Sequence, residues 1–127
     1  IFKTAKGKYV APSPIEMKIS ANSDVEQVCV AGTGLPQPIA LITLSESGKK
    51  KSKDELSVSL KETLDTINPA LDAHEQLDKI VALKGEWTVE NEMLTPTMKI
   101  KRNLVEKKYS SNYENWEKQK GDVVWEN

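Results

Sequence analysis

The chain has little of several residue types, and each shortage argues against a class of protein. Its 127 residues include one cysteine and one histidine, so an internal disulfide is excluded and a zinc site is disfavoured. Basic and acidic side chains nearly cancel, 18 against 19, so the basic excess of a nucleic-acid-binding module is missing. No apolar run reaches the length of a membrane span, and no secretory signal appears. We therefore expect a cytoplasmic protein that binds no nucleic acid.

The length and the first residues indicate a piece of a larger protein. A chain of 127 residues can bury one modest core, which suits one domain. It begins with Ile rather than Met, and the opening Ile1-Phe2-Lys3 is typical of the inside of a strand. We expect an excised domain whose missing partner holds most of the chemistry.

Hydrophobic periodicity predicts an α+β fold. Apolar and β-branched runs predict a two-stranded hairpin around Gly7 within residues 1–10, and further strands at residues 25–30, 38–44 and 79–83. The strands at residues 25–30 and 38–44 are expected to pair as an antiparallel hairpin. Helices are expected at residues 14–20, 52–67 and 101–116. This order predicts a small central sheet of about three strands packed against helices, plus the N-terminal two-stranded hairpin.

The helix over residues 52–67 has the clearest boundaries. Ser52 and Glu55 form a capping-box pattern, in which each side chain satisfies a backbone N–H of the first turn. Apolar residues then recur at helical spacing and form one stripe, made of Leu56, Leu60, Leu64 and Ile67. By contrast, residues 46–53 are predicted to be a polar, lysine-rich loop. Residues 117–127 are predicted to be loosely held.

The cations at positions 99, 101 and 102 form the most informative cluster. Lys99 follows a turn that Pro96 stiffens, and the helix expected from residue 101 stiffens the other side. A lysine held in this way can meet phosphate or carboxylate oxygens and stabilise negative charge that develops in a transition state. The alternative is that Lys99, Lys101 and Arg102 are the solvated start of a helix.

A second basic segment surrounds Gly7. Glycine adopts positive φ angles at little cost, so a tight turn here lets the backbone approach a ligand. Lys6 and Lys8 flank the glycine, and Tyr9 follows. These residues are candidates for contact with a phosphorylated ligand. The alternative is an ordinary hairpin turn that lysines keep soluble.

The remaining candidates favour structural roles. The lysines within residues 49–53 are interpreted as part of a solvated loop. His74 has no Cys or His partner at metal-binding spacing, so no metal site is expected. Cys29 falls in a core strand and is expected to be buried and unreactive.

Together, the two basic segments resemble the small C-terminal domain of the adenylate-forming acyl-CoA synthetases. The segment FKTAKGKYVAPSPIE at residues 2–16 is similar to the family's stretch after the interdomain hinge, where a glycine hairpin precedes a proline and an Ile-Glu pair. The segment TPTMKIKR at residues 95–102 is similar to the family's last motif, which contains the catalytic lysine. Met98 stands where many members have glycine, and this form resembles the long-chain fatty acyl-CoA branch. The resemblance covers residues 2–109.

The resemblance implies a two-step ligase reaction. ATP and a fatty acid give an acyl-adenylate and pyrophosphate, and coenzyme A (CoA) then displaces AMP to form a thioester, with the small domain rotating between the steps. ATP, CoA and Mg²⁺ would be bound mainly by the absent N-terminal adenylation domain, which is the expected partner. By resemblance, the site residues are the catalytic Lys99, the supporting Lys101 and Arg102, and Lys6, Gly7, Lys8 and Tyr9 on the CoA side.

Residues 1–112 are accordingly expected to form the lid domain, and residues 113–127 a C-terminal tail. Without its large domain, the fragment is expected to fold but not to catalyse. Peripheral association of the full-length enzyme with a membrane is compatible with the resemblance. Two alternatives stay open: an acyl-AMP or acyl-carrier ligase of the same superfamily that does not use free CoA, and a non-catalytic α+β interaction module.

Overall fold

A four-stranded mixed sheet forms the centre of the molecule in the computed structural model, which describes residues 1–126. The strands lie in the order β3 (Val25–Ala31), β4 (Ile39–Leu44), β5 (Ile80–Ala82) and β6 (Val123–Trp125). β3 and β4 are antiparallel, as expected, whereas β4, β5 and β6 run parallel to one another. The α+β prediction is confirmed, and β6 is a fourth strand that the sequence analysis did not expect.

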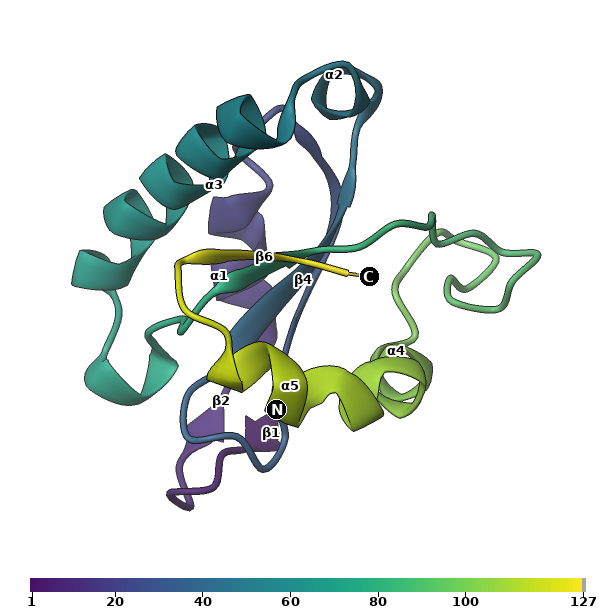
Figure 1. The fold of residues 1–127 in the computed structure, drawn as a ribbon. Coiled ribbons are helices and arrows are strands. Elements are labelled where there is room, and N and C mark those ends of the chain that lie inside the picture. The colour runs from purple at the N-terminus through teal and green to yellow at the C-terminus, as the bar shows by residue number, and fades with distance from the viewer. Residues whose placement is uncertain (127) are drawn as a thin grey trace.

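Helices cover both faces of this sheet (Figure 1). On one face lie α1 (Pro12–Ile19) and α3 (Lys53–Ile67), whose apolar side chains form one core with the sheet. On the other face, α4 (Arg102–Tyr109) and α5 (Tyr113–Lys118) contribute to a second core. Because successive side chains of a strand point to opposite faces, β3 serves both cores: Val28 and Val30 enter the first, and Cys29 and Ala31 the second.

The helix starts follow the local sequence. At the start of α3, Ser52 Oγ accepts from the Glu55 N–H (3.1 Å), and Glu55 Oε1 accepts from the Ser52 N–H (3.0 Å), so the capping box is confirmed. The apolar stripe of α3 is buried as expected. α1 starts at Pro12 rather than at residue 14, because Pro12 occupies the first helical position and no side chain caps the helix.

Short helical turns replace two expected features. Residues 46–53 are not a continuous loop, because α2 (Glu46–Lys49) forms there with the Ser45 hydroxyl accepting from the Gly48 N–H. The expected helix over residues 101–116 is divided by the 3-10 turn η3 (Ser110–Asn112) into α4 and α5. Two further 3-10 turns, η1 (Asn68–Ala70) and η2 (Ala73–Glu75), link α3 to β5. Among residues 1–126, no helix has the length and apolar character that a bilayer crossing requires.

The end of the chain is built into the core, so the expectation of a loosely held end is wrong for the residues that the structure describes. β6 pairs with β5, matching Ile80 to Val123, and Val124 is buried. The Lys79 side chain is also buried, and its ammonium donates to the carbonyl oxygens of Glu117 and Gln119 near the end of α5. Pairing with the edge of β5 therefore orders an apolar run that looked isolated in sequence. The predicted tail also includes Asn127, which lies outside the described residues.

Candidate functional site

Lys99 directly follows a tight turn formed by residues 95–98. The Met98 N–H donates to the Thr95 carbonyl oxygen (2.8 Å), and the Thr95 N–H donates to the Lys99 carbonyl oxygen (2.7 Å). Thr95 Oγ1 accepts from the Lys99 N–H at 3.0 Å. Thr95 therefore holds both backbone groups of Lys99, while the Lys99 side chain is exposed.

Met98 has a left-handed backbone, with φ at 67°. This conformation costs an L-residue about 1–2 kcal/mol, whereas glycine adopts it freely. The turn thus requires a positive φ at the position where the resembling family has glycine. The Met98 side chain is 62% exposed, so burial offsets little of the cost.

The base of the turn is closed on both sides. Leu94 and Ile100 form an isolated antiparallel bridge, and Leu94 is fully buried. The Lys101 N–H donates to the Met93 carbonyl oxygen (2.8 Å), and α4 begins directly afterwards at Arg102. The segment that carries Lys99 is therefore anchored before and after the lysine.

Arg102 points into the fold. Its Nη1 and Nη2 donate to the two carboxylate oxygens of Glu16 on α1, at 2.6 and 3.0 Å. Nη1 also donates to the Val30 carbonyl oxygen (3.0 Å), and Glu16 Oε2 accepts from the Val30 N–H (2.8 Å). Burial disfavours the charged guanidinium, but the hydrogen bonds and charge interactions with Glu16 and Cys29 together outweigh it, and the pKa of Arg102 is raised. The structure thus brings Arg102 to Glu16 and the edge of the sheet.

Cys29 lies behind this ion pair. It is fully buried, and its Sγ accepts from Arg102 Nη1 at 3.4 Å. Burial raises the pKa of the Cys29 thiol to about 12. The thiol therefore stays protonated near neutral pH, which fits the expected buried role.

The Gly7 hairpin, made of β1 (Phe2–Lys3), β2 (Tyr9–Val10) and the turn between them, forms as expected. The Gly7 N–H donates to the Thr4 carbonyl oxygen (3.0 Å), and the Thr4 N–H donates to the Lys8 carbonyl oxygen (2.9 Å). Gly7 has φ at 77°, which favours glycine. Lys6 and Lys8 are exposed, as is Tyr9. The hairpin therefore presents two cations and an aromatic ring around Gly7, where no side chain covers the backbone.

The loop between β3 and β4 supports the Gly7 hairpin from behind. The Ala5 N–H donates to the Leu35 carbonyl oxygen (2.8 Å). Lys6 Nζ donates to Gln37 Oε1 (3.1 Å), and the Gln37 amide donates to the carbonyl oxygens of Ala73 and Gln76. Gln37 was not among the predicted site residues, because an isolated glutamine between two prolines gives no signal of such a role.

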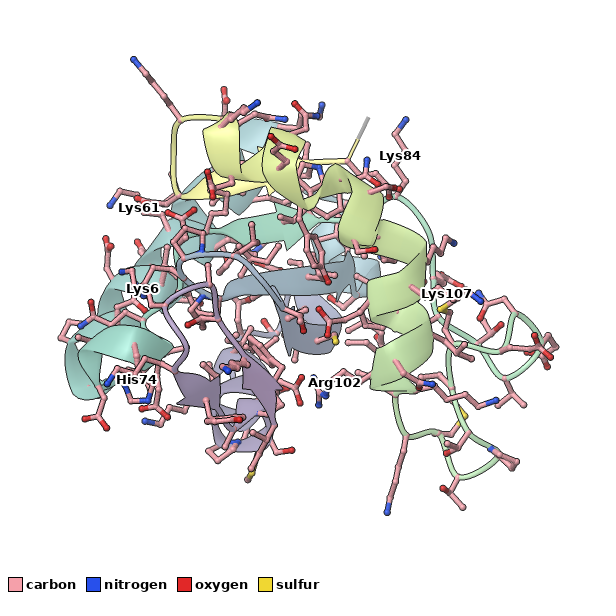
Figure 2. The ribbon with its side chains drawn as sticks, turned by 90° about the horizontal axis from the view of Figure 1, so that it is seen from below. Lys6, Lys61, His74, Lys84, Arg102 and Lys107 are labelled. Carbon is pink, nitrogen blue, oxygen red and sulfur yellow. The ribbon has the colours of Figure 1, made fainter. Side chains whose placement is uncertain are left out.

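The Gly7 hairpin and the Lys99 turn lie on different sides of the molecule. In Figure 1 the purple hairpin is at the bottom, whereas the green segment between β5 and α4 projects to the right. Figure 2 shows Lys6 and His74 at one side of the view and Lys107, on α4, at the other. The structure therefore groups the candidates at residues 6–9 and keeps them apart from Lys99.

The lysine cluster at residues 49–53 is exposed but not merely solvated. Lys49 forms ion pairs with Glu46 and Glu86. Lys51 Nζ lies 2.9 Å from Oδ2 of the buried Asp24, and Lys53 lies over the Trp125 ring, 5.3 Å from its centroid. These contacts tie the α2–α3 region to its neighbours, so their role is structural.

His74 lies on η2 with two carboxylates. Among the residues that the structure describes, Asp72, His74 and Glu75 are the one group of His, Cys, Asp and Glu side chains close enough to share a metal ion. Glu75 Oε1 also accepts from the Asp72 N–H as part of a capping box. All three belong to one short, accessible turn, which the capping box of Asp72 and Glu75 holds without an ion.

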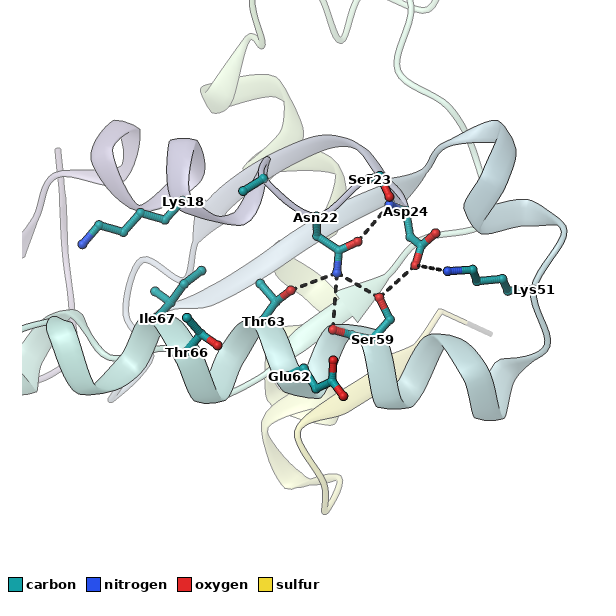
Figure 3. Close-up of a pocket in the computed structure, with 11 residues that line it drawn as sticks. Lys18, Asn22, Ser23, Asp24, Lys51, Ser59, Glu62, Thr63, Thr66 and Ile67 are labelled. Atoms are coloured by element: carbon teal, nitrogen blue, oxygen red, sulfur yellow. Dashed lines mark hydrogen bonds and ion pairs between the residues drawn. The ribbon is translucent and has the colours of Figure 1, made fainter.

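A shallow pocket of about 470 Å³ opens between α1 and α3 (Figure 3). The Asn22 amide at its centre donates to the hydroxyls of Ser59 and Thr63. Ser59 Oγ donates in turn to Asp24 Oδ2 (2.8 Å), and the Lys51 hydrogen bond helps to lower the pKa of Asp24. These hydrogen bonds join the turn before β3 to α3.

A second hollow adjoins the Lys99 turn. It measures about 510 Å³ and is bounded by α1, the outer strand β3 and the turn. Met17 and Met98 line it and are 77% and 62% exposed. The surface beside Lys99 is therefore partly apolar, a character that suits contact with another protein surface.

Comparison with known proteins identifies relatives over most of the chain. The AMP-binding enzyme C-terminal domain family matches residues 1–119. Long-chain-fatty-acid–CoA ligase FadD15 of Mycobacterium tuberculosis is 30% identical over 131 aligned residues, which cover 90% of this chain and 22% of that protein. Long-chain-fatty-acid–CoA ligase 5 of Mus musculus is 35% identical over 120 residues, which cover 80% and 18%. The chain thus spans about a fifth of the length of these relatives.

Solved structures share the fold. The adenylation domain of a carboxylic acid reductase from Segniliparus rugosus, in complex with AMP and a co-purified carboxylic acid, aligns with a TM-score of 0.69 at 22% identity, covering 91% of this chain and 19% of that one. The adenylation domain of a carboxylate reductase from Mycobacterium chelonae aligns with a TM-score of 0.69 at 20% identity, covering 91% and 19%. At these identities, the likeness shows a common fold.

Proposed function

This chain belongs to the family of AMP-binding enzyme C-terminal domains, and on that basis we propose that it is the mobile lid of an ATP-dependent, AMP-forming long-chain fatty acyl-CoA ligase. Identities of 30% and 35% to two long-chain-fatty-acid–CoA ligases support this substrate class. The observation that carries the proposal is the exposed Lys99 side chain on a turn whose backbone Thr95 fixes on both sides.

Lys99 is the proposed catalytic residue of the first half-reaction. A fatty-acid carboxylate oxygen attacks the α-phosphorus of ATP, the bond to pyrophosphate breaks, and an acyl-adenylate forms. Negative charge develops on the phosphoryl oxygens, and an ammonium delivered to them stabilises the transition state. Because the backbone of Lys99 is already ordered, little further ordering is needed when the lid closes.

The Gly7 hairpin is the proposed contact for the second half-reaction. The thiol of CoA attacks the acyl carbon, AMP leaves, and a thioester forms. Lys6 and Lys8 can pair with phosphates, and the bare backbone at Gly7 lets the CoA chain pass closely, with Tyr9 beside it. Since this hairpin and Lys99 lie on different sides, rotation of the lid between the steps would present each in turn.

The large N-terminal adenylation domain is the proposed partner of this chain. Lysine side chains suit the phosphates of ATP and CoA, whereas Mg²⁺ prefers carboxylate, phosphate and water oxygens. We place the Mg²⁺ ligands on that domain, where the ion would neutralise phosphate charge. A cytoplasmic location and peripheral membrane association of the full-length enzyme stay predictions.

The test separates the two half-reactions in the full-length enzyme. Lys99→Ala is expected to slow acyl-adenylate formation about 10²- to 10³-fold, while thioester formation from supplied acyl-adenylate changes little. Lys107→Ala, an exposed lysine on α4, is the matched control. Equal losses in both half-reactions would contradict the role of Lys99. The 127-residue chain alone, mixed with ATP, Mg²⁺, CoA and fatty acid, is expected to yield no acyl-CoA.

The acceptor thiol separates this proposal from the acyl-carrier alternative. The full-length enzyme, charged with acyl-adenylate, is offered free CoA or the phosphopantetheine thiol of a carrier protein. Transfer to free CoA is expected. Transfer to the carrier alone would assign the chain to the other branch of the superfamily.

A further inference from the structure

The free edge of the sheet is closed at one point by two side chains. β3 is an outer strand of the sheet, so its outward backbone groups need partners other than a strand. At Val30, Glu16 Oε2 accepts from the N–H and Arg102 Nη1 donates to the carbonyl oxygen. The ion pair therefore occupies the place that a neighbouring strand would take.

This ion pair is well built. Both oxygens of Glu16 meet both terminal nitrogens of Arg102, and the side chains are 15% and 27% exposed. A bidentate pair whose remaining groups are also hydrogen-bonded is geometrically specific. Loss of one partner would leave the other charge half-buried and unpaired, which is costly.

The pair lies beside the Lys99 turn in the chain. Arg102 is the first residue of α4 and follows Lys99 closely, with only Ile100 and Lys101 between them. Thr95 and the bridge of Leu94 hold the start of the turn. Arg102 therefore anchors its far end to α1 and β3.

We propose that Glu16 and Arg102 are positioning residues for adenylation, because their ion pair fixes the direction in which the Lys99 side chain leaves the lid. This inference rests on the proposed function of Lys99. Neither side chain needs to touch ATP or the fatty acid. Since Glu16 stands on the helix that follows the Gly7 hairpin, the pair also couples the two candidate sites into one body that turns as a unit.

Two conservative variants of the full-length enzyme test the proposal. Glu16→Gln keeps an oxygen that can accept from the Val30 N–H but removes the charge. Arg102→Lys keeps the charge but loses the fork that makes the pair bidentate. Each is expected to lower kcat of acyl-adenylate formation about 10- to 100-fold, the effect of a small displacement of a catalytic group. The KM for ATP and the rate of thioester formation from supplied acyl-adenylate are expected to stay within about twofold.

A matched control separates positioning from general destabilisation. Lys51→Met breaks another ion pair, that with the buried Asp24, and it lies far from the turn in sequence. This variant is expected to lower the thermal midpoint while slowing neither half-reaction selectively. A selective loss of adenylation in Lys51→Met, or equal losses of both half-reactions in the Glu16 and Arg102 variants, would overturn the proposal.

Parallel measurement of Lys99→Ala separates the positioning role of Glu16 and Arg102 from the catalytic role of Lys99. If Lys99→Ala cripples adenylation but the Glu16 and Arg102 variants do not, the positioning role fails and the catalytic role stands. If Lys99→Ala leaves adenylation intact, the proposed function itself fails. A readout without turnover is tryptic cleavage after Lys99 and Lys101, which is expected to become several-fold faster in both positioning variants. Cleavage at the wild-type rate in both would show that the pair does not hold the turn and would overturn the inference.

Discussion

The Tyr113 hydroxyl donates a 2.7 Å hydrogen bond to Glu106 Oε1 and so joins α5 to α4. The same carboxylate accepts from the Gly32 and Thr33 N–H groups and from the Thr33 hydroxyl. Burial by itself would raise the pKa of Glu106, but the hydrogen bonds outweigh it and the pKa is lowered. Burial and the hydrogen bond to Glu106 raise the pKa of Tyr113. One carboxylate therefore fixes the β3–β4 loop to the second helical layer.

This arrangement predicts a specific loss of stability in acid. The pKa of Glu106 is lower in the folded state than its ordinary value of 4.5, so an unfolded chain takes up the proton first as the pH falls. The stabilisation is complete above the unfolded-state pKa and is lost as the pH drops through the folded-state pKa. Glu106→Gln is expected to lower the free energy of unfolding at pH 7 by about 1–3 kcal/mol. It should also flatten the decline of that free energy as the pH falls below the ordinary glutamate value of 4.5.

Urea unfolding at a series of pH values measures this effect. Glu114→Gln is the control, because Glu114 is exposed and forms an i,i+4 pair with Lys118. If the free energy of unfolding of Glu106→Gln declines in acid as steeply as that of the wild type, Glu106 is not the source of the acid sensitivity.

A side chain at position 48 is expected to destabilise the fold, because Gly48 packs closely against the backbone of Asp24. A Cβ at this position would lie 2.5 Å from the Asp24 carbonyl oxygen. Because a backbone carbonyl cannot rotate away as a side chain can, Gly48→Ala is expected to lower the free energy of unfolding by about 1–3 kcal/mol. Gly85→Ala is the control, since nothing lies within 4 Å of a Cβ there, and should change it by less than about 0.5 kcal/mol. Thermal unfolding that ranks the two variants alike would refute the contact.

At Met98, by contrast, a substitution is expected to stabilise the fold. The Met98 φ of 67° suits glycine, so Met98→Gly is expected to raise the free energy of unfolding by about 0.5–1 kcal/mol, after allowance for the greater freedom of glycine in the unfolded chain. Met98→Ala keeps the Cβ and therefore the strain, so no such gain is expected. Chemical unfolding of both variants checks the difference, and equal gains would show that the backbone angle is not the cause.

Local patterns predicted the local structure well. The α3 helix has both a capping box and an apolar stripe, so two independent signals agreed on its place. Gly7 and its neighbours marked the hairpin because a positive φ favours glycine. The exposure of Lys99 also follows from the polar, proline-containing turn around it.

Contacts between distant residues could not be predicted in this way. Glu16 and Arg102 are 86 positions apart, and their charges give no sign of pairing until α1 and α4 meet at β3. β6 was missed because its short apolar run becomes a strand only through the open edge of β5. The break between α4 and α5 depends on packing as well, since Tyr109 and Tyr113 both turn toward the buried Trp116.

Substitutions in the Gly7 hairpin are expected to impair the CoA step and to spare adenylation, the reverse of the effect expected for Lys99→Ala. In the full-length enzyme, Lys6→Ala combined with Lys8→Ala is expected to raise the KM for CoA about 5- to 30-fold, as for the loss of one or two exposed charge contacts of about 1 kcal/mol each. Acyl-adenylate formation should change little, because the hairpin and the segment that carries Lys99 lie on different sides of the domain. Lys118→Ala, an exposed lysine on α5, is the control for a general change in surface charge. Steady-state kinetics with CoA as the varied substrate measures the effect. A raised KM for ATP with an unchanged KM for CoA would contradict the proposed role of the hairpin in thioester formation.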